Sequence, residues 1–369
     1  MQPSNGTTVI GAGSLGLFAS LWLARRGERV TVLDKGTPMR EASGVNAGSL
    51  GVQNKLLPLV PWTVAALEHW ATAQDLVGAD VGFSRTGGLR IATDEREVAL
   101  LRTGFQAQSD AGIKLEWFEG DEVRARAPYL SPDVRAASYC ASDCVADPLR
   151  LAPALLRTVQ DLGVTIKPSS EVQSIERCGE SFLVRTGDEE VVSRRLLVAA
   201  GAWSQPLCAR LGLHMPVALD VNMVSVTEPR QRAMTEVVTH VRGILTLKQV
   251  ANGTFLIGGG WQGVGDLKSG HKDVAYESSL HNIRLATRIV PELKSAMLVR
   301  QWAGFEGVSP DSLPYAGRIP GAENAYVLAC ARGGWTLAPE LGRAMAGLML
   351  DGRTDVSLDR FRPERYANG

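Results

Sequence analysis

The sequence predicts an α/β fold joined to an antiparallel β-sheet, and three observations support this fold class. A glycine-rich turn between an apolar strand and a helix lies near the start, within residues 9–36. Strand-like apolar runs follow one another between residues 213 and 302, with the hairpin signal Asn252-Gly253 between two of them. The length of 369 residues favours two domains, or one large domain with an insertion.

The glycine-rich turn has the spacing of a dinucleotide-binding motif. Gly11, Gly13 and Gly16 follow the predicted strand Thr7–Ile10 and open a helix. They allow a tight turn, close approach of a pyrophosphate, and close packing of helix on strand. Free N–H groups at the helix start, where Ser14 and Leu15 lie, favour the bound diphosphate.

An acidic residue follows the second predicted strand, Arg29–Leu33. Asp34 comes eighteen residues after Gly16, where a carboxylate accepts hydrogen bonds from ribose hydroxyls and repels a 2′-phosphate. The motif therefore disfavours NADP and leaves NAD and FAD open.

Composition excludes several other classes of function. The 39 basic and 39 acidic residues cancel, so no global field attracts nucleic acid or anionic lipid. Five irregularly spaced cysteines predict reduced, buried thiols in a cytoplasmic protein, with no metal site. We expect no signal peptide before Val9 and no membrane span, because the apolar run Leu15–Ala24 is shorter than the roughly 20 residues needed.

The small polar stretch "ASGVNAGSLG" at residues 42–51, read with the first motif, resembles the D-amino-acid-oxidase-like (DAO) family of FAD-dependent oxidoreductases, in its glycine oxidase and amine dehydrogenase branch. Five later segments match family motifs in order, so the resemblance covers nearly the whole chain. They are "CVADPLRLAPALLRTVQDLGV" (144–164) with "SSEVQSIE" (169–176), "RRLLVAAGAWSQPLCARLGL" (194–213), "WAGFEGVSPDSLPYAGR" (302–318) and "ACARGGWTLAPELGRAMAGLMLDG" (329–352).

The resemblance implies FAD as the cofactor. The FAD is expected to be non-covalent, because no cysteine lies near residues 302–310. Backbone N–H groups at the start of the last helix, near residue 335, can stabilise the negative charge of a reduced flavin. Besides the first motif, the implied cofactor residues are Asp34, Lys35, Ser43, Asn46, Ala47, Gly48, Leu50, Val172, Ala200, Gly201, Trp203, Gly304, Arg332, Gly333, Gly334, Trp335, Thr336 and Leu337.

The motifs also divide the chain. Residues 1–80, 141–212 and 303–369 are expected to form a Rossmann-like FAD-binding domain. Residues 81–140 and 213–302 are expected to form a glycine-oxidase-like substrate domain, an antiparallel sheet that caps the flavin. The polar tail after Gly352 is expected to be extended on the surface.

The resemblance implies oxidation of a C–N bond by hydride transfer to flavin N5, with hydrolysis of the imine product. Relatives that bind glycine carry an arginine where this chain has Glu306, which disfavours a nearby carboxylate. Arg332 remains as a candidate carboxylate anchor, or as the partner of an acid such as Glu306. Lys248 is either near N5 or, as we expect, a surface charge on a hairpin. Imino acids, opines and other N-substituted amino acids are the favoured substrates.

Two alternatives stay open at this point. The chain is either an enzyme by itself or a flavin-holding subunit of a dye-linked dehydrogenase that passes electrons to a partner, as a homo- or hetero-oligomer. An NAD-dependent dehydrogenase is the weaker alternative, because the loops at 43–48 and 329–339 do not predict it.

Overall fold

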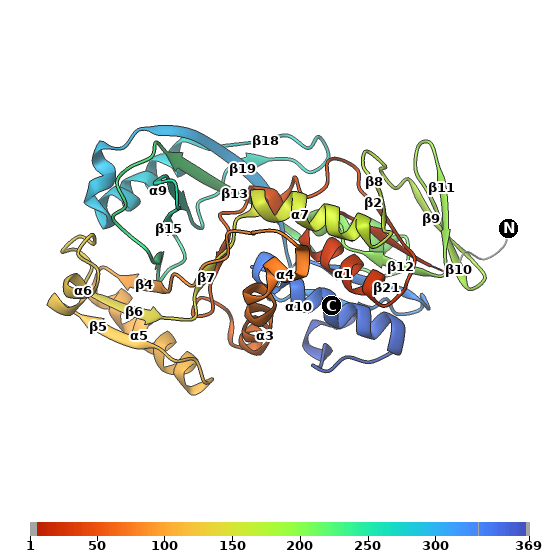
Figure 1. The fold of residues 1–369 in the computed structure, drawn as a ribbon, viewed down its shortest axis with the longest axis horizontal. Helices are drawn as coiled ribbons and strands as arrows, with labels where there is room; N and C mark the ends of the chain where they lie inside the picture. Colours follow the sequence, from red (N-terminus) through yellow and green to blue (C-terminus); the bar gives the residue numbers. More distant parts are fainter. Residues whose placement is uncertain (1–5, 331, 367–369) are drawn as a thin grey trace.

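The computed structural model describes residues 6–330 and 332–366 and contains two large sheets. Figure 1 shows the six-stranded sheet, with a small three-stranded sheet beyond it, on the right and the eight-stranded sheet on the left. Mixed α/β structure of two sheet systems is the fold class that the sequence predicts.

The six-stranded sheet is parallel except at one edge. Its order is β20-β21-β12-β1-β2-β8, and only the β20–β21 pair is antiparallel. Its central strands are mostly apolar and buried, as strands covered on both faces are, whereas the edge strand β8 is partly exposed. They are β1 (Thr7–Ile10), β2 (Val30–Leu33), β8 (Thr165–Lys167), β12 (Arg195–Val198), β20 (Tyr315–Arg318) and β21 (Ala325–Ala329).

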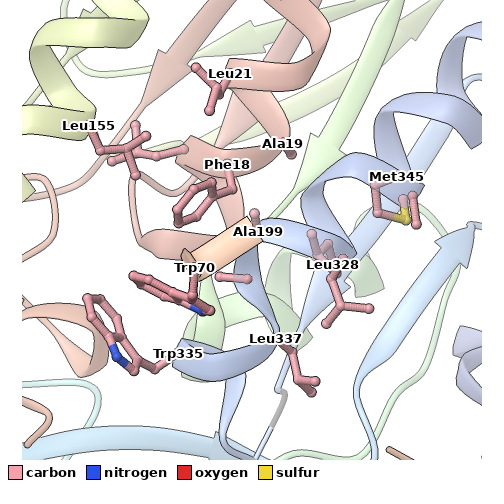
Figure 2. Packing of buried hydrophobic residues seen from close by; sticks show 14 of the residues in the cluster. Phe18, Ala19, Leu21, Trp70, Leu155, Ala199, Leu328, Trp335, Leu337 and Met345 are labelled. Carbon is pink, nitrogen blue, oxygen red and sulfur yellow. The ribbon is translucent and has the colours of Figure 1, made fainter. Parts of the chain in front are cut away.

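Helices cover one face of this sheet and pack into a continuous core (Figure 2). They are α1 (Ser14–Arg25), α3 (Val60–Ala71), α4 (Ala73–Val77), α7 (Pro148–Asp161) and α10 (Gly334–Asp351). Trp70 of α3 lies between Phe18 and Trp335, with ring centroids 6.0 and 5.1 Å away. Its indole N–H donates to the Thr336 carbonyl at 2.9 Å, which ties the first turn of α10 to the core.

The eight-stranded sheet has the order β19-β13-β16-β15-β14-β4-β6-β5. The predicted hairpin at residues 252–253 joins β15 and β16, which pair antiparallel. One expectation needs correction, because β14 and β4 pair in parallel. Strand β19 runs unbroken through residue 303, where a boundary between the two domains is expected. The strands are β4 (Gly88–Ala92), β5 (Glu116–Glu119), β6 (Ala136–Cys140), β13 (Ala218–Thr227), β14 (Val237–His240), β15 (Thr246–Gln249), β16 (Phe255–Gly258) and β19 (Leu298–Val308).

The other elements are short or lie at the periphery. One small antiparallel sheet contains β9 (Ser174–Cys178), β10 (Ser181–Arg185) and β11 (Glu190–Ser193). Two further pairs of strands are β3 (Ser49–Leu50) with β7 (Cys144–Val145), and β17 (Val264–Gly265) with β18 (Lys272–Asp273). The remaining helices are α2 (Ala42–Val45), α5 (Glu95–Asp110), α6 (Asp121–Arg126), α8 (Ser204–Ala209) and α9 (Tyr276–Ile289), with 3₁₀ turns η1 (Leu57–Leu59), η2 (Gly201–Trp203), η3 (Pro291–Ser295), η4 (Asp359–Phe361) and η5 (Pro363–Tyr366).

The C-terminal segment differs from the expected extended tail. Phe361 is buried, and Arg365 forms a bidentate ion pair with Asp311 with both N–O distances at 2.9 Å. Residues 367–369 of the predicted tail, and Ala331 of the final predicted loop, lie outside the described residues.

Other sequence expectations concern thiols, metals and membranes. Four cysteines are free and buried, but Cys178 on β9 is exposed, which corrects the expectation of buried thiols throughout. Within the described ranges, no group of three potential metal-ligating side chains is assembled, and no helix has the length and apolar character to cross a bilayer.

Candidate functional site

A cleft of about 700 Å³ receives residues from both sheet systems. Most of the predicted cofactor residues line it, together with Glu306. Those that do are Gly11, Gly13, Ser14, Leu15, Asp34, Lys35, Ser43, Asn46, Ala47, Gly48, Val172, Ala200, Gly201, Trp203, Gly304, Arg332, Gly333, Gly334, Trp335 and Thr336. The structure thus brings together residues that are up to about 320 positions apart in the sequence.

Three predicted cofactor residues lie behind the cleft rather than in its wall. Leu50 and Leu337 are fully buried in the helical core. Gly16 packs helix on strand, because a Cβ there would lie 2.0 Å from the Gly11 carbonyl oxygen. For Leu50 and Leu337 this position corrects the expectation of direct contact with the cofactor, whereas for Gly16 close packing of helix on strand is the role that the sequence predicts.

The first turn of α1 forms the phosphate end of the cleft. Gly13 caps the helix without a side-chain hydrogen bond, and the first turn carries no acidic residue. The Ser14 N–H donates to the Ser43 hydroxyl at 2.8 Å. The uncapped helix end is therefore suited to an anionic ligand.

Asp34 braces this turn. One of its oxygens accepts from the Ala12 N–H and the other from the Gly36 N–H, both at 2.8 Å. The carboxylate is thereby fixed at the carboxyl end of β2, which is where a dinucleotide ribose binds in such folds.

The loop at residues 42–48 is held by its own asparagine. The Asn46 side-chain amide donates to the Ser43 carbonyl at 2.6 Å and accepts from the Gly48 N–H at 2.7 Å. Gly48 has a φ of 73°. This conformation lets the loop pass beneath the cleft without a side chain in the way.

The start of α10 forms the opposite end. Gly333 caps the helix in the left-handed region with a φ of 71°, again without a side-chain cap or an acidic first turn. Two buried polar atoms in the cleft wall, Ser49 Oγ and Trp335 Nε1, have no hydrogen-bond partner in the described structure. Two uncapped helix starts and unpartnered polar atoms fit a long cofactor with phosphates at one end and a polar ring at the other.

A charged cluster lies beside the start of α10. Asp220 and Glu306 are direct cross-strand partners on β13 and β19, so their side chains share one face of the sheet. Asn222, on the same face of β13, donates to Glu306 at 2.6 Å. Arg332 forms an ion pair with Asp220 rather than with Glu306, and its side chain is 47% exposed.

Burial raises the pKa of Glu306, although Arg332, Asn222 and the Gly333 N–H oppose the shift. A carboxyl whose pKa is raised by burial holds a proton more readily than an exposed carboxylate does. This makes Glu306 a candidate proton acceptor for a ligand in the cleft.

The interpretation of Lys248 as a surface charge is wrong. The residue is 5% exposed, and burial lowers its pKa to about 8, with Asp147 opposing the shift. Its ammonium group lies behind the loop, 3.2 Å from where a Cβ on Gly48 would be, and it does not line the cleft. It was misplaced because the alternation of a short strand does not show which sheet covers each face.

Lys55 lines the cleft and was missed by the sequence reasoning. A signal was available, because Lys55 is the only charged residue between Glu41 and Glu68. Asp220 and Asn222 were missed as well, and no local pattern marks them.

The chain is similar in sequence and in fold to several known proteins. The model of the DAO family, described as FAD dependent oxidoreductase, matches residues 7–348. A subunit of opine oxidase from Rhizobium meliloti is 28% identical over 375 residues, which cover 97% of each chain. The structure of glycine oxidase from Geobacillus kaustophilus is similar at a TM-score of 0.92, with 25% identity and 98% of both chains covered. That of L-proline dehydrogenase from P. horikoshii gives a TM-score of 0.90, with 25% identity and coverage of 100% and 99%.

Proposed function

Because the chain belongs to the DAO family of FAD-dependent oxidoreductases, we propose that it oxidises the C–N bond of an amino acid or secondary amine. Imino acids, opines and other N-substituted amino acids are the favoured substrates. The observation that carries the proposal is the charged cluster of Glu306, Asn222, Asp220 and Arg332 beside the start of α10.

The reaction divides between cofactor and protein. FAD, when bound, supplies the two-electron acceptor for a hydride from the carbon next to nitrogen, and the resulting imine hydrolyses in water. Glu306 attracts the cationic amine and accepts the proton that the ammonium must lose, because only the neutral amine readily releases hydride. Arg332 offers a planar pair of N–H donors to a substrate carboxylate at the cleft.

The test is an anaerobic titration of the purified flavoprotein with D- and L-amino acids, proline derivatives, opines and simple amines. Bleaching of the flavin band by one class identifies the substrate, and admission of air then separates an oxidase from a dehydrogenase. Failure of every amine to bleach a flavin that dithionite reduces would refute the proposal.

Arg332→Ala tests the anchor within the same assay. We expect substrate binding to weaken by several-fold or more while flavin content stays at the wild-type level. Arg332→Lys serves as the control for charge without the planar fork. Unchanged kinetics of Arg332→Ala on carboxylate substrates would remove Arg332 from the substrate site.

A second candidate function is supported by one observation. The matched opine oxidase chain is named as a subunit, so we also propose that this chain acts within a complex and passes electrons to a partner. Turnover by the isolated chain with an artificial dye, without turnover with oxygen, would support this arrangement. Full turnover with oxygen alone would argue against it.

A further inference from the structure

Lys55 lies on a loop whose backbone is fixed from several sides. The Lys55 carbonyl accepts from the Gln108 side chain at 3.1 Å, and the Val52 N–H donates to Asp143 at 2.6 Å. Gln53, which is buried, donates to the Gly88 carbonyl at 2.8 Å. These bonds join the loop between β3 and η1 to the eight-stranded sheet, so the origin of the Lys55 side chain is preorganised.

The Lys55 ammonium group reaches the start of α10. A Cβ built on Gly333 would lie 2.1 Å from Lys55 Nζ, so the ammonium occupies the space beside that glycine. Across the described residues, Lys55 Nζ has no hydrogen-bond or ion-pair partner. A cation held in a cleft without a protein partner is expected to find its partner in a ligand.

Two acidic side chains from separate segments act on Lys55. Glu306 on β19 and Asp143 in the turn before β7 favour its charged form, but desolvation outweighs them and lowers its pKa to about 8. Arg332, in the loop before α10, acts on the same Glu306. The Lys55 side chain is therefore mainly cationic at neutral pH and loses its proton as the pH rises above about 8.

Arg332 and Lys55 differ in whether their charged groups have a protein partner. Arg332 already pairs with Asp220 and is half-exposed, whereas Lys55 lacks such a partner among the residues that the structure describes. Both cations interact with Glu306, which places a negative group among two positive ones. We infer that Lys55 forms a second anion subsite in the cleft, so that the preferred substrate is a secondary amine that carries a carboxylate on each arm.

The inference rests on the proposed function and deepens it. A zwitterion of this class presents one ammonium and two carboxylates, which matches in charge the one acid, Glu306, and the two cations, Arg332 and Lys55, that interact with it in the cleft. A monocarboxylate amine leaves one of the two cations without a partner. Discrimination between these two substrate classes is therefore expected to depend on Lys55.

The experiment compares wild type, Lys55→Gln and Lys55→Arg as FAD-loaded proteins, with Lys114→Gln as a control at an exposed lysine. The substrate probes are iminodiacetate and N-methylglycine, and their oxidation is monitored as anaerobic reduction of the flavin. Glutarate and butyrate are unreactive probes, and their binding is measured by calorimetry and by the change in the flavin spectrum. Lys55→Gln is expected to weaken the binding of the dicarboxylates iminodiacetate and glutarate by about tenfold or more. Binding of the monocarboxylates N-methylglycine and butyrate is expected to weaken by less than about threefold.

The pH profile supplies a readout that a structural role would not give. Dicarboxylate affinity of the wild type is expected to fall as pH rises through about 8, where Lys55 loses its proton. Lys55→Arg is expected to keep that affinity to higher pH, because the guanidinium stays charged.

Each outcome decides a separate point. Equal losses for dicarboxylates and monocarboxylates in Lys55→Gln, or no loss at all, would overturn the subsite. Lys55-dependent glutarate binding in a protein that oxidises none of the amines would support the subsite and refute the proposed function.

Discussion

A single methyl group at Gly16 is expected to disturb both the fold and the cofactor end of the cleft. In Gly16→Ala the new Cβ would lie 2.0 Å from the Gly11 carbonyl oxygen and 3.3 Å from the Ala199 side chain. The first contact is with backbone, so it cannot be relieved by rotation of a side chain. Relief requires helix α1 to move from the sheet or the glycine-rich turn to change shape.

The magnitude follows from two opposing terms. Alanine in a helix is favoured over glycine by about 1 kcal/mol, whereas overpacking of a close-packed site costs about 1–3 kcal/mol or more. Because the contact is with backbone, we expect the upper part of that range, so that the free energy of unfolding falls by up to about 2 kcal/mol. FAD affinity is expected to fall as well, because the carbonyl that is displaced belongs to the turn beside the phosphate end of the cleft.

The assay is urea unfolding followed by tryptophan fluorescence, with flavin content measured from the absorption spectrum. Gly104→Ala in helix α5 is the matched control, because a Cβ there would come no closer than 3.8 Å to an Arg90 guanidinium nitrogen. This control is expected to gain about 0.5–1 kcal/mol of stability. A Gly16→Ala protein as stable as Gly104→Ala, with full flavin content, would refute the steric reasoning.

Two further predictions concern Asp34 and the C-terminal segment. Asp34→Asn is expected to raise the dissociation constant for FAD by about tenfold or more, since a charge-assisted hydrogen bond contributes about 1.5–3 kcal/mol; equilibrium dialysis measures it, and unchanged affinity would count against the bracing role. Arg365→Ala is expected to lower the free energy of unfolding by about 1–3 kcal/mol, with Arg365→Lys in between. Burial alone would raise the pKa of Asp311, but the hydrogen bonds from Arg365 outweigh this effect and lower the pKa to about 2. The stability contributed by the pair is therefore present above the ordinary aspartate pKa and is lost as pH falls towards 2. Thermal unfolding from pH 6 to pH 2 should show this loss in wild type and not in Arg365→Ala.

The sequence predicted the cofactor half of the site because its signals are local. Gly11, Gly13 and Asp34 lie within one strand–helix–strand unit, and their spacing alone indicates the geometry. The family match to an FAD-dependent family then confirms FAD over NAD. The loops at 43–48 and 332–336 were found through resemblance, since a short polar loop has no periodicity that marks its function.

The substrate half was harder to predict because its contacts join distant residues. Asp220 and Arg332 are 112 positions apart, and Asn222 and Glu306 are 84 apart. Sequence reasoning proposed Glu306 as a partner for Arg332, but the register of β13 against β19 places Asp220 there as well. The register brings the two acids together, and the ion pair shows that Asp220 is the one that meets the guanidinium.

The same register explains how one cofactor scaffold accommodates different substrates. Cofactor contacts at the two ends of the cleft are expected to come mainly from backbone at the starts of α1 and α10. Positions 220, 222 and 306 are side chains on one face of two paired strands, so substitution there changes the charge of the cleft without changing the backbone beside the cofactor. Gly304, opposite Asn222, is an exception, because a Cβ there would lie 2.1 Å from a methyl carbon of Val45 in α2, so that Val45 or its loop would have to shift. Substrate preference is therefore expected to vary through Lys55, Asn222 and Glu306, while Gly304 stays fixed by packing.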